Sequence, residues 1–217
     1  MVFRLTGEGH NGGMASARVL FQGDSITDCG RDRNDPLSLG FGYAALAAAQ
    51  AFANEPALDI EFMNRGIGGH RVYDLEARWS EDCIDLRPDV VSILIGINDT
   101  WRRYDSNVVS PINEFKDSLQ RICERVTNEL QAHLVLMEPF VLPVPADREQ
   151  WREDLDPRIQ AVRAVARDLG ATLVPLDGIF AAAACDQPPA FWTPDGVHPS
   201  LPGHALIAKA VLEAMGL

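Results

Sequence analysis

Five short apolar runs that alternate with helix-like segments are the feature that most limits how this chain can fold. The runs are rich in β-branched residues and occupy residues 18–23, 59–64, 89–96, 132–139 and 171–176. Helical patterns occupy residues 42–53, 72–83, 112–130, 157–169 and 203–215. Strands separated by helices at this rhythm form βαβ units, which place parallel strands in one sheet through right-handed crossovers. The pattern therefore predicts an α/β protein with a three-layer α/β/α sandwich.

A single domain fits the size of the chain. Its 217 residues can bury a substantial core, and apolar residues make up 47% of them. We predict one domain over residues 18–217, preceded by a flexible extension at 1–17 that lacks the apolar stretch of a signal peptide. Two long connections, 29–41 and 141–156, follow predicted strand ends and are either functional loops or plain solvated ones.

Charge and cysteine usage exclude several function classes. The net charge of −12 argues against a nucleic-acid partner and against an anionic membrane surface. No run approaches the roughly 20 apolar residues of a membrane span. The four cysteines are far apart and match no zinc template, so we expect reduced thiols, no metal and a cytoplasmic location.

Polar residues at the predicted strand ends are the candidates for chemistry. The first run leads directly into Gly23-Asp24-Ser25, which leaves a hydroxyl at the carboxyl end of a strand, where open α/β sheets bind ligands. A serine hydroxyl needs a base to become a nucleophile. Asp195 and His198 are three residues apart in a proline-braced loop, a spacing that lets the carboxylate accept the imidazole Nδ1–H while Nε2 points outward.

Two further strand ends offer hydrogen-bond donors. The second ends in Asn64-Arg65-Gly66-Ile67-Gly68-Gly69, whose glycines let a backbone N–H approach a ligand or simply make a turn. The third ends in Gly96-Ile97-Asn98-Asp99. The Asn98 amide is suited to stabilise an oxyanion, or alternatively to cap the next helix.

Taken together and in this order, the four segments resemble the SGNH hydrolases, also called the GDSL esterase/lipase family. The resemblance extends from about Arg18 to the end of the chain and implies a flavodoxin-like five-stranded parallel sheet. It implies a two-step acyl transfer without a cofactor, in which Ser25 is the nucleophile, His198 the base and Asp195 its orienting partner. The oxyanion hole it implies consists of the N–H groups of Ser25 and Gly69 and the Asn98 side chain. Gly68 stands where many relatives have serine.

Within that family, longer strings resemble bacterial acetyl-xylan and acetylated xylo-oligosaccharide esterases. They are Gly23 to Arg31, Leu75-Glu76-Ala77-Arg78-Trp79 and Gly96 to Asp105. The implied substrate is a small acetyl ester, in particular an acetylated sugar, and relatives of this group are often homo-oligomers. As substrate-binding residues we predict Asp24, Trp101, Tyr104 and Trp192; aromatic side chains could equally be packing residues.

Two alternatives stay open at this point. One is an esterase of the same mechanism that acts on a lysophospholipid, a thioester or an aryl ester. The other is a non-catalytic carbohydrate-binding relative, for which the joint presence of Ser25, Asn98, Asp195 and His198 would have no purpose.

Overall fold

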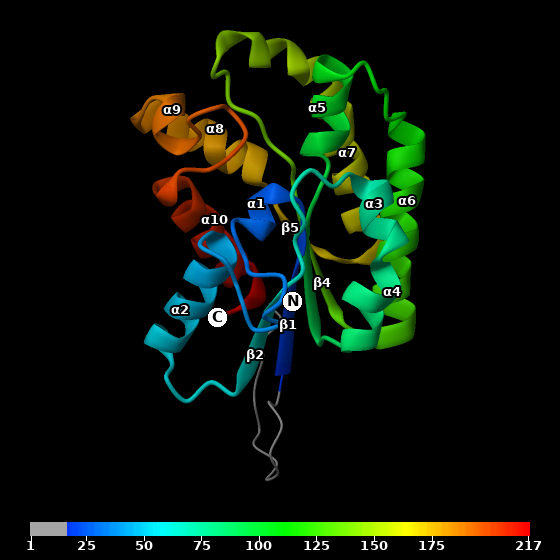
Figure 1. Cartoon of the computed structure of the whole chain (residues 1–217), viewed down its shortest axis with the longest axis vertical. Coiled ribbons are helices and arrows are strands. Elements are labelled where there is room, and N and C mark those ends of the chain that lie inside the picture. Colours follow the sequence, from blue (N-terminus) through cyan, green and yellow to red (C-terminus); the bar gives the residue numbers. More distant parts are fainter. Residues whose placement is uncertain (1–16) are drawn as a thin grey trace.

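A parallel sheet of five strands runs through the middle of the protein in a computed structural model that describes residues 17–217 (Figure 1). The strands are β1 (Ala17–Gly23), β2 (Ile60–Asn64), β3 (Val90–Leu94), β4 (His133–Met137) and β5 (Thr172–Val174). Their order is β2-β1-β3-β4-β5, and all four neighbouring pairs are parallel. The predicted three-layer sandwich and its flavodoxin-like sheet are confirmed.

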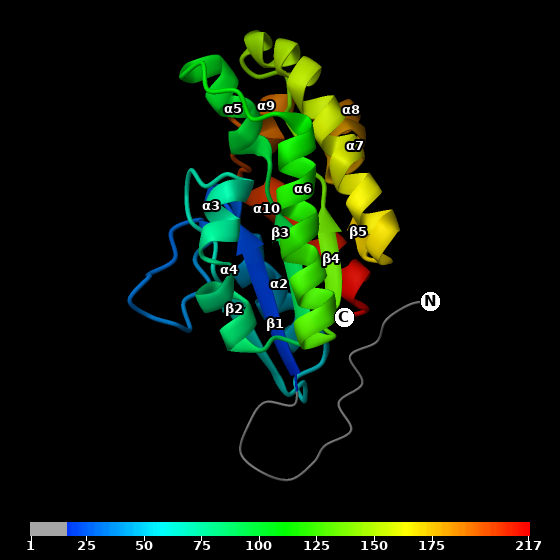
Figure 2. The same ribbon diagram turned by 90° about the vertical axis from the view of Figure 1, so that its right-hand side faces the viewer.

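Helices cover both faces of this sheet (Figures 1 and 2). One face carries α2 (Tyr43–Asn54), α8 (Leu176–Asp186), α9 (Pro189–Trp192) and α10 (Leu201–Met215). The other carries α3 (Val72–Ala77), α4 (Trp79–Asp82), α6 (Ile112–Arg125) and α7 (Arg152–Leu169). Two short helices, α1 (Ser25–Asp28) and α5 (Ile97–Asp105), begin directly after β1 and β3. Short 3₁₀ or π turns occupy Ile84–Leu86, Val126–Leu130 and Ala146–Trp151.

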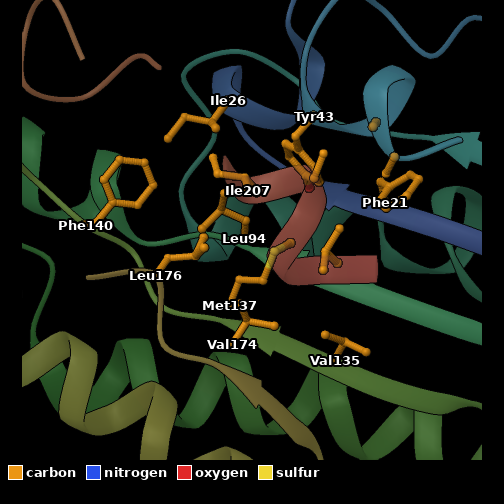
Figure 3. Close-up of a cluster of buried hydrophobic side chains, with 14 of the residues drawn as sticks. Phe21, Ile26, Tyr43, Leu94, Val135, Met137, Phe140, Val174, Leu176 and Ile207 are labelled. Atoms are coloured by element: carbon orange, nitrogen blue, oxygen red, sulfur yellow. The ribbon is translucent and has the colours of Figure 1, made fainter. Parts of the chain in front are cut away.

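Alternation along the strands divides the core into two clusters. In β1, Val19 and Phe21 face the side of α2 and α10, whereas Leu20 faces α3, α4 and α6. Figure 3 shows the first cluster, in which Phe21 lies beside Tyr43. All five residues of β3 are buried, as its continuous apolar sequence predicts. Each fully buried large apolar side chain contributes about 1.5–3 kcal/mol, so these two layers hold the strand ends in place.

Several elements differ from the sequence-based expectation. The predicted helix at 72–83 is broken at Arg78 into α3 and α4. The predicted loop at 141–156 contains the 3₁₀ turn Ala146–Trp151, and α7 begins before the loop was expected to end. Four helices, α1, α5, α8 and α9, were not predicted. Helix α8 buries only Leu176 and Phe180, so its apolar periodicity is weak.

The domain boundary differs from the prediction by one residue. Ala17 pairs with Ile60 and is the first residue of β1, so it belongs to the sheet and not to the predicted extension. Residues 1–16 of that extension lie outside the described residues. Within 17–217, none of the helices has the length and apolar character that a bilayer crossing requires.

Candidate active site

The four sequence segments with candidate chemistry meet at the carboxyl ends of β1, β2 and β3. Ser25 begins α1, the glycine segment 64–69 joins β2 to α3, and Asn98 lies in the first turn of α5. Asp195 and His198 lie in the connection between α9 and α10. Figure 1 shows these elements at the same end of the sheet.

The turn that presents Ser25 requires its neighbours. A Cβ at Gly23 would lie 2.3 Å from both the Leu94 carbonyl oxygen and Thr27 Oγ1, so only glycine fits there. The Asp24 side chain accepts a hydrogen bond of 3.0 Å from the Ile26 N–H and caps α1. The half-buried Ser25 is the first residue of that helix.

Ser25, His198 and Asp195 form one chain of hydrogen bonds. Ser25 Oγ lies 3.0 Å from His198 Nε2, and His198 Nδ1 lies 2.7 Å from Asp195 Oδ2. The other carboxylate oxygen, Oδ1, accepts the N–H of Val197 at 3.0 Å and that of His198 at 2.7 Å. The side chains of His198 and Asp195 are 44% and 43% exposed, so the chain lies at an open surface.

The electrostatics favour one protonation pattern. Partial burial opposes ionisation of Asp195, but its bonds from His198 and Val197 outweigh it, and the pKa of Asp195 is below its usual value. An ionised Asp195 accepts the Nδ1–H of His198, which leaves Nε2 free to accept the Ser25 hydroxyl proton. An arrangement of this kind is chemically able to activate the Ser25 hydroxyl as a nucleophile.

Three hydrogen-bond donors on the segments after β1, β2 and β3 have hydrogens available. The N–H groups of Ser25 and Gly69 form no hydrogen bond within residues 17–217. The Asn98 side chain is 3% exposed and donates one Nδ2–H to the His70 carbonyl at 3.1 Å, which leaves its second hydrogen available. Gly96 occupies the N-cap of α5 and Asn98 makes no cap bond, so the capping alternative for Asn98 is wrong.

Hydrogen bonds from side chains for which the sequence predicted no role hold the glycine segment against the nearby backbone. Asn64 donates to the Thr27 carbonyl at 2.7 Å and accepts the Gly66 N–H at 2.8 Å. The Gly68 N–H donates to Asp28 at 2.9 Å, so it is committed to that carboxylate. Arg78 donates to the carbonyls of Arg65 at 2.7 Å and Gly23 at 3.2 Å. Arg78 belongs to the string Leu75-Glu76-Ala77-Arg78-Trp79, whose resemblance to the family was the only sequence signal that Arg78 matters.

Two buried carboxylates lie behind the surface. Asp24 is fully buried, its Oδ2 has no hydrogen-bond partner, and burial raises its pKa to about 7. Burial also raises the pKa of Asp99, which accepts the Val72 N–H at 3.1 Å and the Ser110 hydroxyl at 3.0 Å. Because Asp24 has no exposed surface, it cannot contact a substrate, and its predicted substrate-binding role is wrong: it shapes the nucleophile turn instead.

Of the three predicted aromatic residues, Trp101 forms a ring contact with His198, and Tyr104 and Trp192 have other ring partners. The Trp101 ring lies 5.7 Å from the His198 ring and 5.4 Å from the Trp151 ring. Tyr104 instead stacks on Trp151 at 5.3 Å and donates its hydroxyl to the Gln150 carbonyl. Trp192 donates its indole N–H to the Ala183 carbonyl at 2.9 Å and packs against Phe191. Among the described residues, no hydrogen bond or ring pair joins Tyr104 or Trp192 to Ser25 or His198.

A second histidine supports the segment after α1. His204 Nδ1 accepts the Tyr43 N–H at 3.1 Å, so its Nε2 carries the proton that faces Cys29 Sγ at 3.3 Å. Burial, together with the charge of His198, lowers the pKa of His204 to about 4. His204 is therefore neutral and structural at physiological pH. Throughout residues 17–217, no group of three His, Cys, Asp or Glu side chains could hold a metal ion.

Known proteins share this sequence and this fold. Residues 21–206 match the GDSL-like lipase/acylhydrolase family. An acetylxylan esterase of Geobacillus stearothermophilus is 36% identical over 206 residues, covering 92% of this chain and 94% of that protein.

Solved structures agree with these matches. A GDSL-like protein of Parabacteroides merdae superposes with a TM-score of 0.89 at 36% identity, covering 94% of this chain and 97% of that one. An acetylxylan esterase of Geobacillus stearothermophilus does so with a TM-score of 0.86 at 34% identity, covering 94% and 96%. Two structures of the latter enzyme are described as catalytic mutants, one with a serine and one with an aspartate replaced by alanine.

Proposed function

The chain belongs to the GDSL-like lipase/acylhydrolase family and is a carboxylic ester hydrolase, and we propose that it removes acetyl groups from carbohydrates by a Ser25–His198–Asp195 mechanism. The observation that carries this proposal is the continuous hydrogen-bond chain from Ser25 Oγ through His198 to Asp195. The acetylxylan esterase named above supports the acetyl group and the sugar as the two halves of the substrate.

Acylation begins with the Ser25 hydroxyl. Its oxygen attacks the ester carbonyl carbon while His198 Nε2 takes the proton, and Asp195 stabilises the imidazolium that forms. The carbonyl oxygen becomes an oxyanion, which the N–H groups of Ser25 and Gly69 and the Asn98 amide stabilise. His198 then gives its proton to the departing sugar oxygen.

Deacylation repeats these steps with water. His198 Nε2 takes a proton from a water molecule while the water oxygen attacks the carbonyl carbon of the acetyl-enzyme. Collapse of the second oxyanion breaks the bond to Ser25 Oγ and releases acetate, and His198 returns the proton to Ser25 Oγ. This sequence uses the named side chains, the two backbone N–H groups and water.

An aromatic side chain lies beside the base. The Trp101 ring packs against the His198 ring, with 5.7 Å between their centroids. An indole wall of this kind can also contact the face of a sugar ring.

Chain-length preference tests the proposal. We expect p-nitrophenyl acetate to be hydrolysed with a higher kcat/KM than the butyrate and octanoate esters, and acetate to be released from acetylated xylo-oligosaccharides. Ser25→Ala is the control and should be inactive on all of them. A higher kcat/KM for the octanoate ester would indicate a lipase or thioesterase. Equal hydrolysis rates for wild type and Ser25→Ala would indicate a non-catalytic binding protein.

We further propose a cytoplasmic location, where the enzyme would meet imported oligosaccharides. All four cysteines are free thiols, including the exposed Cys185, which fits a reducing compartment. Assembly with copies of itself stays a prediction, which light scattering on the purified protein tests.

A further inference from the structure

The pocket beside Ser25 is lined by charged side chains that the acyl transfer does not use. It has a volume of about 400 Å³, within the range of small-molecule sites, and opens to solvent. Besides Ser25, its lining includes Asp28, Arg31 and Arg33. A bound group in this pocket would therefore lie next to the nucleophile.

Arg31 presents free donors in this pocket. Its Nε–H is used in a 3.0 Å hydrogen bond to the Gly66 carbonyl, which fixes the plane of the guanidinium. The two terminal nitrogens donate no hydrogen bond within residues 17–217. A guanidinium held in this way offers a preorganised pair of N–H groups, the geometry that binds a carboxylate in bidentate fashion.

Arg31 also has no ionic partner. Arg31, Arg65 and Arg87 are the arginines of residues 17–217 that form no ion pair, although the chain carries a net charge of −12. Burial lowers the pKa of Arg31; the negative charge of Asp28 opposes this shift, and the positive charges of Arg65 and Arg33 add to it. The guanidinium therefore has charged neighbours of both signs but no ion pair, and a bound anion would supply one.

The charges of the pocket lining indicate the charge of the ligand. Arg33 is paired with Asp28 at 2.6 Å, and the Asp28 carboxylate also accepts the Gly68 N–H. Two guanidinium groups and one carboxylate leave one net positive charge, which complements a monoanion. The planar pair of free Arg31 N–H groups matches the two oxygens of a carboxylate, so charge and geometry together favour a carboxylate ligand.

We propose that this pocket, with Arg31 as its principal ligand and Arg33 beside it, is a subsite for the carboxylate of an acidic sugar in the substrate. The acetyl ester that Ser25 attacks would then lie on a uronic acid unit or on its neighbour. The subsite rests on the proposed deacetylase function and specifies the class of carbohydrate on which it acts.

A matched pair of substrates tests the subsite. Monoacetylated methyl glucuronoside is compared as the free acid and as its uncharged methyl ester, with p-nitrophenyl acetate as a neutral reference for the acyl transfer. We expect kcat/KM to be about 10- to 100-fold higher for the acid, mainly through a lower KM, as for a charge-assisted hydrogen bond. Because the two substrates carry the same acetyl group, their ratio cancels any change in the acyl transfer itself.

Variants then locate the effect. Arg31→Gln should bring the acid-to-ester ratio close to one, and Arg33→Gln should lower it less, because Asp28 already neutralises Arg33. Arg87→Gln is the matched control: Arg87 is also unpaired, is exposed, and lies before the amino end of β3, away from the site, so the ratio should not change. Should Arg31→Gln not fold, the wild type still gives an answer, since raising NaCl from 20 to 500 mM should lower kcat/KM for the acid and hardly change it for the ester.

The outcomes separate the two proposals. Equal hydrolysis of acid and ester, or an acid preference that Arg31→Gln retains, overturns the subsite while the deacetylase function stands. If the enzyme hydrolyses neither sugar substrate and none of the p-nitrophenyl esters, the proposed function and the subsite are both overturned.

Discussion

Replacing Asn98 by alanine separates a catalytic donor from a structural one. Within residues 17–217 the side chain makes a single hydrogen bond, 3.1 Å from Nδ2 to the His70 carbonyl. Loss of that bond should cost about 1 kcal/mol of unfolding free energy, which for a domain of this size lowers Tm by about 2–4 °C. If the second Nδ2 hydrogen stabilises the oxyanion, kcat should fall by about 10²–10³-fold, or about 2.7–4 kcal/mol in the transition state. The catalytic loss thus exceeds the loss of stability.

The assay is kcat for p-nitrophenyl acetate together with thermal unfolding of the same preparations. Thr100→Ala is the matched control, because Thr100 lies two residues further along α5, is fully buried and accepts a hydrogen bond from Arg158 at 3.2 Å. It should lower Tm by a similar or larger amount with kcat nearly unchanged. A kcat of Asn98→Ala within about threefold of wild type would refute the oxyanion role, and an equal loss in Thr100→Ala would attribute the effect to the position of α5.

Three more predictions concern the surroundings of the triad. Asp195→Asn should lower kcat for p-nitrophenyl acetate about 10⁴-fold, because an amide neither supports the imidazolium nor selects the Nδ1–H tautomer of His198; a loss below tenfold would contradict this. Burial raises the pKa of Asp24 from 3.8 to about 7, so the free energy of unfolding of the wild type should fall as pH rises through that window. Asp24→Asn has no such titration. Its free energy of unfolding relative to wild type, measured in urea, should therefore increase by up to about 4 kcal/mol between pH 4 and pH 8. A constant difference would show that Asp24 does not titrate there. Trp101→Leu should raise KM for an acetylated xyloside about tenfold, whereas Tyr104→Phe should not, because Tyr104 contacts Trp151 and not His198; equal effects would exclude a sugar contact by Trp101.

The sheet and the placement of Ser25, His198 and Asp195 beside one another could be predicted because their signals are local. Each strand is a short apolar run, and each candidate group follows a strand end within a few residues, so the parallel topology alone brings Ser25, Asn98 and the glycine segment together. Asp195 and His198 are close in sequence, and their spacing specifies the hydrogen bond between them. The predicted ends of the strands were less accurate where apolar residues continue beyond the last paired residue. In β3, for example, the apolar run continues to residue 96 but the strand ends at Leu94.

Side-chain direction could not be predicted in the same way. Trp101 and Tyr104 lie one turn apart in α5 and both contact Trp151, yet Trp101 also contacts the ring of His198. Trp192 adjoins the segment with Asp195 but donates to a carbonyl of α8. The pocket with Arg31 depends on the path of the connection after α1, which closes through the Phe41 N–H bonded to the Cys29 carbonyl at 2.9 Å, a contact with no sequence signature.

The hydrogen bonds between segments explain why four short motifs suffice to build the site. Asn64 bonds the glycine segment to the Thr27 carbonyl at 2.7 Å, and His198 bonds to Ser25 at 3.0 Å. The amide of Asn98 holds the carbonyl of His70, the residue after Gly69, so two of the proposed oxyanion donors are fixed relative to one another by the side chain of one of them. Three of the four motifs therefore supply a hydrogen bond to another motif: the glycine segment and His198 each bond to the Ser25 segment, and Asn98 bonds to the residue after the glycine segment. It follows that a substitution at Asn98 removes a donor and also loosens Gly69, and that its effect on kcat should not add to that of a substitution in the glycine segment.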